Sequence, residues 1–213
     1  IVIHLKMTGH LLVKTQKNRS SDAFRDPYNQ FIHHRFILSH GVSIDFSDMR
    51  KFAWMETVKT KDLEELASVR VLGVDALSPQ FTLKKFEEIL EKRKKGVIGP
   101  VLLEQNLVAG IGNIYRSEAL FVAGILPNRR VSSLSSDEQN KLFRAIKKVL
   151  RRAVRYRGTS DGDFRDTDGL PGGFQRRLGV YRQTGEPCPK CGTPIERMVL
   201  GQRSAFFCPQ CQH

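Results

Sequence analysis

The chain has 213 residues, 40% of them hydrophobic and 27% charged, so it can form one large domain or two small domains with buried cores. No apolar run approaches the length of a membrane span, so we predict a soluble globular protein without a membrane partner. The formal net charge is +13, and residues 141–213 hold fifteen Lys and Arg against six Asp and Glu. This basic C-terminal third favours nucleic acid as the partner, with a generic basic protein as the alternative.

The first part of the chain alternates strand patterns with turns. The predicted strands cover residues 1–7, 35–39, 42–47 and 52–58, with a polar loop over residues 14–30 and turns at residues 40–41 and 48–52. Within the third strand Val42, Ile44 and Phe46 alternate with Ser43, Asp45 and Ser47, which predicts one buried face and one wet face. The strand at residue 1 begins without a turn or cap, so we expect preceding sequence to be missing and the β-sandwich to be incomplete.

The character of the sequence changes after residue 58. A connector over residues 59–79, with a short helix near residues 63–67, leads to helix patterns at residues 82–95, after Pro100, after residue 115 to about 123, and at residues 136–156. Thr82 can cap the first of these helices, Gly124 can end the third, and Ser135 with Glu138 forms a capping box for the last. The Asp- and Gly-rich residues 161–173 are expected to form a flexible loop. The fold class predicted is therefore α+β.

Two glycines precede the predicted helix that ends near residue 123. Gly110 and Gly112 allow a tight turn whose free backbone amides can hold a phosphate. The pattern alone is weak, because a simple tight turn would look the same. In a basic protein it favours binding of a DNA backbone.

All four cysteines lie near the C-terminus, as Cys188, Cys191, Cys208 and Cys211. Two C-x2-C knuckles separated by sixteen residues supply the four thiolates that a closed tetrahedral Zn2+ site requires, so one structural zinc is predicted. Two disulfides are the alternative, which the lack of an export signal argues against. The residues between the knuckles predict a hairpin with Arg203 near its tip, where an arginine can reach a phosphate or remain a solvated turn residue.

The sequence resembles the family of bacterial formamidopyrimidine-DNA glycosylases, which is related to endonuclease VIII, over essentially the whole chain. The matching stretches are HLKMTG at residues 4–9, DMRKF at 48–52, LLEQ at 102–105, AGIGNIY at 109–115 and QRSAFFC at 202–208. The resemblance implies a β-sandwich, a helix-two-turns-helix unit and a zinc finger. We accordingly assign residues 1–58 to the remainder of the β-sandwich, 59–79 to a connector, 80–173 to the helix-two-turns-helix domain and 174–213 to the zinc finger.

The resemblance implies a monomeric base-excision repair enzyme of the bacterial cytoplasm. Such an enzyme removes 8-oxoguanine and formamidopyrimidines from double-stranded DNA, acts on abasic sites and cuts the strand by β,δ-elimination. It flips the damaged nucleotide out of the stack, because the sugar carbon is otherwise unreachable.

The resemblance also assigns roles to individual residues, one stretch of the sequence at a time. Met7, Arg50 and Phe52 match the residues that fill the vacated space and hold the orphaned base, with ordinary core packing as the alternative for Met7 and Phe52. Asn113 matches a phosphate-binding residue, and Arg203 matches an arginine that contacts phosphates and assists elimination. Lys94 and Lys95 fall near a basic DNA contact of the family, and residues 161–174 match a loop that closes over the flipped base.

The departures from the family pattern concern the chemistry. The family's nucleophile is an N-terminal proline followed by a glutamate acid, and a lysine lies on a strand before the matched region; none of the three occurs here. Phe31 stands where a DNA-contacting histidine is usual, although His33 and His34 are close, and Gly99 replaces a usual lysine. The chain as written is therefore expected to be inactive. A non-catalytic DNA-binding protein of the same family and an RNA-binding zinc ribbon remain as alternatives.

Overall fold

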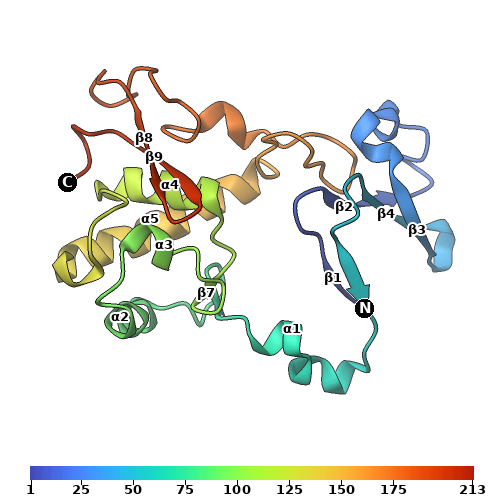
Figure 1. Cartoon of the computed structure of the whole chain (residues 1–213). Coiled ribbons are helices and arrows are strands. Elements are labelled where there is room, and N and C mark those ends of the chain that lie inside the picture. The colour runs from blue at the N-terminus through green and yellow to red at the C-terminus, as the bar shows by residue number, and fades with distance from the viewer. The chain divides into compact units, whose positions relative to one another are not determined.

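The chain folds into two separately packed units, seen here in a computed structural model that describes residues 1–213 (Figure 1). The sheet unit comprises Ile1–Leu66 and Ala153–Arg177, and the helical unit comprises Ala67–Arg152 and Leu178–His213. None of the helices is long and apolar enough to span a bilayer. The predicted α+β class is confirmed, and the four-part division of the chain stays a prediction.

The elements of the two units follow one another in a simple order. Along the chain they are β1 (Val2–His4), β2 (Gly9–Lys14), β3 (Ile32–Ile37), β4 (Ser43–Asp48), β5 (Trp54–Glu56), α1 (Ala67–Arg70), β6 (Val74–Asp75), α2 (Leu83–Lys92), α3 (Ile98–Val101), β7 (Val108–Ala109), α4 (Asn113–Ala123), α5 (Ser136–Arg155), β8 (Glu196–Leu200) and β9 (Arg203–Phe207). The short parallel pair β6 and β7 was not predicted.

The sheet unit contains two small antiparallel sheets. One pairs β1 with β5, and the other has the order β2, β4, β3, so the predicted hairpin of β3 and β4 is confirmed. The first strand ends at His4 rather than at residue 7. Its chain turns there because Lys6 takes a left-handed conformation, with φ of 51°, and the Gly9 N–H donates to the Leu5 carbonyl at 2.9 Å.

The expected wet face of β4 is buried, which corrects the prediction. The Asp45 carboxylate is fully buried and accepts a hydrogen bond from Arg35 Nε at 2.6 Å, while Lys14 Nζ lies 2.8 Å from it. Ser47 is also buried and donates to the Tyr28 carbonyl at 3.3 Å. Polar residues can occupy this face because each has a partner there.

The two polar loops of the sheet unit are held to each other. The loop at residues 14–30 forms two 3-10 turns, Asp22–Arg25 and Pro27–Gln30. Arg165 of the second loop donates to Asp26 at 3.0 Å, and Asn29 Nδ2 donates to the Gly169 carbonyl at 2.9 Å. The flexibility expected of residues 161–173 stays a prediction, and these contacts show what any opening of that loop has to break.

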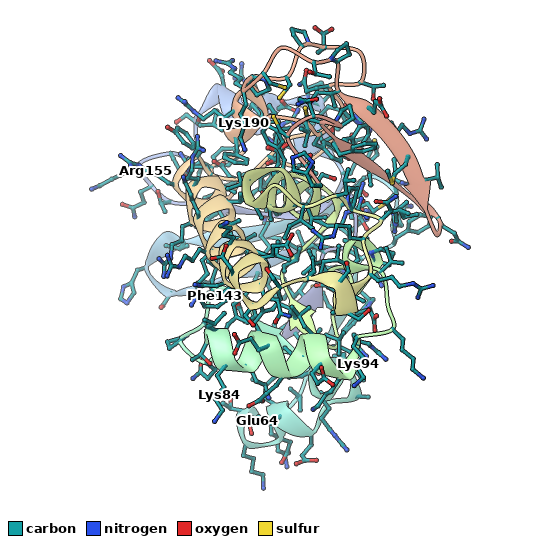
Figure 2. All side chains as sticks on the ribbon, turned by 90° about the vertical axis from the view of Figure 1, so that its left-hand side faces the viewer. Glu64, Lys84, Lys94, Phe143, Arg155 and Lys190 are labelled. Atoms are coloured by element: carbon teal, nitrogen blue, oxygen red, sulfur yellow. The ribbon has the colours of Figure 1, made fainter.

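The helical unit is built on apolar faces of its helices. Phe143 of α5 packs beside α2, with its ring centroid 5.3 Å from that of Phe81 and 6.2 Å from that of Phe86 (Figure 2). Thr82 caps α2 as predicted, because its Oγ1 accepts from the Lys85 N–H at 3.2 Å.

The ends of the helices agree with most of the sequence signals. The capping box is confirmed, since the Ser135 N–H donates to Glu138 at 2.8 Å and the Glu138 N–H donates to Ser135 at 3.3 Å. Gly124 ends α4 in a left-handed conformation, also as predicted. Three boundaries were wrong: α2 ends at Lys92 rather than at residue 95, α3 starts before Pro100 rather than at it, and α4 starts at Asn113 rather than after residue 115.

The C-terminal hairpin of β8 and β9 lies beside α4 (Figure 1). The buried Glu118 carboxylate of α4 accepts three backbone N–H groups, from Gly179 at 2.8 Å, Val180 at 3.0 Å and Tyr181 at 2.9 Å. The Gln212 amide donates to the Ile125 carbonyl, just beyond the end of α4, at 2.7 Å. Helix α4 and the C-terminal hairpin of β8 and β9 therefore form one packed body.

Candidate metal centre and nucleic-acid interface

The four cysteine sulfurs of the hairpin converge on one point. All four lie within 4.8 Å of one another, with Sγ of Cys188 at 3.9 Å from Cys211 and Sγ of Cys191 at 3.5 Å from Cys208. A tetrahedral zinc with Zn–S bonds of about 2.3 Å separates its sulfurs by about 3.8 Å, which these distances match. All four cysteines are free thiols, so the disulfide alternative is excluded.

The electrostatics of the thiols also call for a cation. Hydrogen bonds from Thr193 lower the pKa of Cys191 to about 6, which favours its thiolate. The pKa of Cys211 is raised to about 12, mainly by its hydrogen bond with Cys191 and to a smaller extent by burial. Four sulfurs this close ionise together only if a positive ion offsets their repulsion. The donor set therefore fits one structural zinc held by these four cysteines.

The turn before α4 leaves its backbone open. Gln105 holds the turn from one side, because its Nε2 donates to the Ile111 carbonyl at 2.8 Å and its Oε1 accepts from the Gly110 N–H at 3.0 Å. Gly110 has φ of +94°, a conformation that favours glycine, and a Cβ at Gly110 or Gly112 would meet nothing within 4 Å. No side chain caps the first turn of α4, so its free N–H groups are available to an anion.

Asn113 and the hairpin tip are joined by a buried arginine. Asn113 is the first residue of α4, and its Oδ1 accepts from Arg116 Nη2 at 2.8 Å. The same Nη2 donates to the carbonyl of Ser204 at 2.7 Å, beside the exposed Arg203. The structure thus brings the predicted residues Asn113 and Arg203 to one local network.

Met7, Arg50 and Phe52 also come together, in the sheet unit. The Arg50 guanidinium lies over the Phe52 ring at 4.8 Å from its centroid, and Arg50 Nη1 approaches the Met7 sulfur at 3.9 Å. Met7 is 59% exposed and Phe52 57% exposed, so core packing, the alternative for both residues, is wrong. Lys6 and Lys51, which precede them, both have left-handed backbones, with φ of 51° and 58°.

A buried carboxylate organises the two turns that carry this exposed cluster. Asp48 accepts hydrogen bonds from the Thr8 hydroxyl, from the Arg50 N–H at 3.3 Å and from the Ala53 N–H at 2.8 Å. The Thr8 oxygen in turn accepts from the Arg50 N–H at 3.2 Å. Burial opposes ionisation of Asp48, but the hydrogen bonds from Thr8 and from the backbone outweigh it and lower its pKa.

The remaining predicted contacts belong to α2 and its neighbourhood. Lys94 and Lys95 follow α2, and Lys94 projects near its end, where its Nζ pairs with Glu91 at 2.6 Å (Figure 2). The hydrogen bond to Glu91 raises the pKa of Lys94. Gly99 is buried, and a Cβ there would lie 2.6 Å from the Pro127 carbonyl oxygen, so a lysine would not fit unless this backbone moved.

Two residues beside the site went unrecognised in the sequence. Arg116 was not singled out because charged helix residues are usually solvated. Nothing in the sequence indicated that Thr8 would bond to Asp48 and to the Arg50 N–H. The one signal available for Arg116 was its position one helical turn after Asn113, where it can contact that side chain.

Comparison with known proteins places these features in a family. Residues 72–164 match the formamidopyrimidine-DNA glycosylase H2TH domain, and residues 185–213 match a zinc finger found in FPG and IleRS. The chain is 42% identical to a formamidopyrimidine-DNA glycosylase of Herpetosiphon aurantiacus and 39% identical to one of Pelotomaculum thermopropionicum. In both cases it is matched over its whole length and covers 74% of the relative.

Solved structures give the same result. The chain is similar to the MutM (FPG) protein of Thermus thermophilus, with a TM-score of 0.82 and 37% identity over 99% of this chain and 74% of that one. It is also similar to the Lactococcus lactis Fpg in a complex with abasic-site DNA, with a TM-score of 0.82 and 31% identity over the same shares of the two chains.

Loss of one zinc ligand should release the metal. We expect native mass spectrometry to find one zinc per wild-type chain and none in Cys191→Ser, because three ligands bind far more weakly than a closed set. The hairpin should then lose its protection from proteolysis. Gln202→Ala, at the exposed hairpin tip, is the control and should keep its zinc; full zinc retention by Cys191→Ser would contradict the assignment.

Acid should loosen the turns held by Asp48. Because the pKa of Asp48 is lowered on folding, its contribution to stability is complete above the unfolded value of about 3.9 and is lost as pH falls through the folded value. Between pH 5 and pH 2.5 the free energy of unfolding, measured with urea, should therefore fall more in the wild type than in Asp48→Asn. Asp45 titrates in both proteins, so an equal fall in the two would refute the role of Asp48.

Proposed function

The chain belongs to the formamidopyrimidine-DNA glycosylase family, and on that premise we propose that it recognises damaged bases in duplex DNA for excision. The observation that carries the proposal is the exposed cluster of Met7, Arg50 and Phe52. Two large apolar side chains stand in water beside a guanidinium, on turns held by a buried carboxylate. A fold gains nothing from that exposure, whereas insertion into a base stack buries it.

The chemistry of the three side chains suits a flipped nucleotide. A thioether and an aromatic ring can fill the space that a departing base leaves, because one adapts in shape and the other stacks. Arg50 is the group that hydrogen-bonds the base left without a partner. Its contact with the Phe52 ring keeps the guanidinium near the gap until DNA arrives.

The backbone of the DNA would be held by the helical unit. Asn113 and the free N–H groups of α4 bind one phosphate, and Arg203 at the rigid hairpin tip binds another and assists elimination. Lys94 and Lys95 add a further phosphate contact, since the exposed pair of Lys94 with Glu91 is weak enough to exchange for DNA. The zinc supplies no chemistry and keeps the hairpin in shape.

The substrates proposed are oxidised purines, namely 8-oxoguanine and formamidopyrimidines, together with abasic sites. Solved structures of the Lactococcus lactis protein contain DNA with an abasic site or with Fapy-dG, which supports this choice. The products would be those of base removal followed by β,δ-elimination. One chain acts on one flipped base, so we propose a monomer, working in the bacterial cytoplasm.

The groups that break the glycosidic bond are a separate matter. In the family pattern they are an N-terminal proline and the glutamate after it, and residues 1–213 include neither. We therefore propose that residues 1–213 alone bind damaged DNA without cutting it, and that cleavage requires both groups to be supplied.

Binding to a duplex with an abasic-site analogue tests the proposed interface. Arg203→Ala should weaken binding and lower the slope of log K against log salt by about one phosphate contact. Asn113→Ala should weaken binding about tenfold, the worth of one hydrogen bond to a phosphate. The matched control is Lys84→Ala, which removes an exposed charge at the other end of α2 (Figure 2) and should change neither value. Normal binding by both site variants would disprove the interface.

A further inference from the structure

Arg116 of α4 is a buried cation without a buried counter-ion. Its side chain is fully buried, and its Nη2 makes the two hydrogen bonds to Asn113 and Ser204. The Nε and Nη1 groups are also buried and have no hydrogen-bond partner. Burial, opposed by Tyr181 and assisted by the neighbouring charge of Arg203, lowers the pKa of Arg116 to about 10, so the guanidinium still carries its charge at neutral pH.

Such an arrangement is unfavourable for the free protein. A buried charge without an ion-pair partner keeps part of its desolvation penalty, and replacement of such groups by apolar residues is often neutral or stabilising. Two unsatisfied N–H groups add to the penalty. Arg116 also lies in the first two turns of α4, where the positive end of the helix dipole repels its charge. A bound anion would reduce this repulsion.

The two bonds that Arg116 does make fix the orientation of other groups. Because Asn113 Oδ1 is occupied as an acceptor, the Asn113 Nδ2 donors are left to face a ligand. Because the Ser204 carbonyl is also occupied, the residue after Arg203 is tied to α4 at the same nitrogen. The Arg116 guanidinium therefore fixes both the Asn113 amide on α4 and the backbone of Ser204 next to Arg203.

We propose that Arg116 is a positioning residue of the phosphate-binding site, which presets the Asn113 amide and the Arg203 tip and whose charge is balanced by a bound DNA phosphate. This inference rests on the proposed function, because it assumes that Asn113 and Arg203 contact the DNA backbone. If it is correct, removing the Arg116 side chain should weaken DNA binding without lowering the stability of the free protein.

The test is a double-mutant cycle with duplex DNA that contains an abasic-site analogue. Arg116→Met keeps an unbranched side chain but removes the charge and the donors. Its melting temperature should equal or exceed that of the wild type, while its Kd should rise about tenfold. In the Asn113→Ala background the same substitution should raise Kd by clearly less than tenfold, because one of the two groups that Arg116 orients is gone.

Arg116→Lys and an NMR signal separate positioning from simple structural support. Lysine keeps the charge, but its shorter side chain and tetrahedral ammonium do not reproduce the planar geometry with which the guanidinium bonds Asn113 and Ser204. The Kd of Arg116→Lys should therefore also rise severalfold. The side-chain amide signals of Asn113 should shift in both Arg116 variants and stay unchanged in the Lys84→Met control. A purely structural residue would lower the melting temperature without these effects.

Each outcome is decisive. Additive effects in the cycle, wild-type affinity in Arg116→Lys, or unfolding of both variants would overturn the proposal. Failure of the wild type to bind duplex DNA would instead overturn the proposed function. Weak binding by Asn113→Ala together with normal binding by Arg116→Met would refute the inference alone.

Discussion

Two buried side chains of opposite charge, Arg116 and Glu118, attach the zinc hairpin to helix α4. Glu118 binds three successive backbone N–H groups at the start of the C-terminal segment, and Arg116 binds the Ser204 carbonyl on β9. The Glu118 carboxylate is satisfied by its three bonds, whereas Arg116 keeps two buried N–H groups without a partner. Because the hairpin is held by these bonds and by its own metal, Arg203 occupies a fixed place relative to Asn113. The phosphate contacts proposed for the helical unit depend on that attachment.

The sheet unit follows the same physical logic with a different group. Asp48 is buried, and its hydrogen bonds set the two turns from which Met7, Arg50 and Phe52 project into water. In both units a buried polar group fixes exposed groups that the fold itself does not use. Order before contact lowers the entropic penalty of binding, which suits the DNA contacts proposed for each unit.

Local signals in the sequence predicted local features well. The capping box at Ser135, the helix end at Gly124 and the paired cysteine knuckles each depend on a few neighbouring residues, and the structure has all three. The buried face of β4 was mispredicted because Asp45 and Ser47 are satisfied by residues distant in sequence. Arg116 was missed for the same reason: its burial depends on Ser204, which lies 88 residues away. Pattern reasoning cannot locate such partners until the chain is folded.

The measurement that tests the account most directly is borohydride trapping on a duplex that carries 8-oxoguanine opposite cytosine. Residues 1–213 would be compared with a fusion that adds the N-terminal segment of the Herpetosiphon aurantiacus relative. The account predicts that both proteins bind the duplex and that only the fusion forms a covalent adduct, because the proline amine must attack the sugar before a Schiff base can be reduced. A binding-competent fusion without adduct would indicate a DNA-binding member of the family that no longer cuts. An adduct with residues 1–213 alone would contradict the assigned nucleophile.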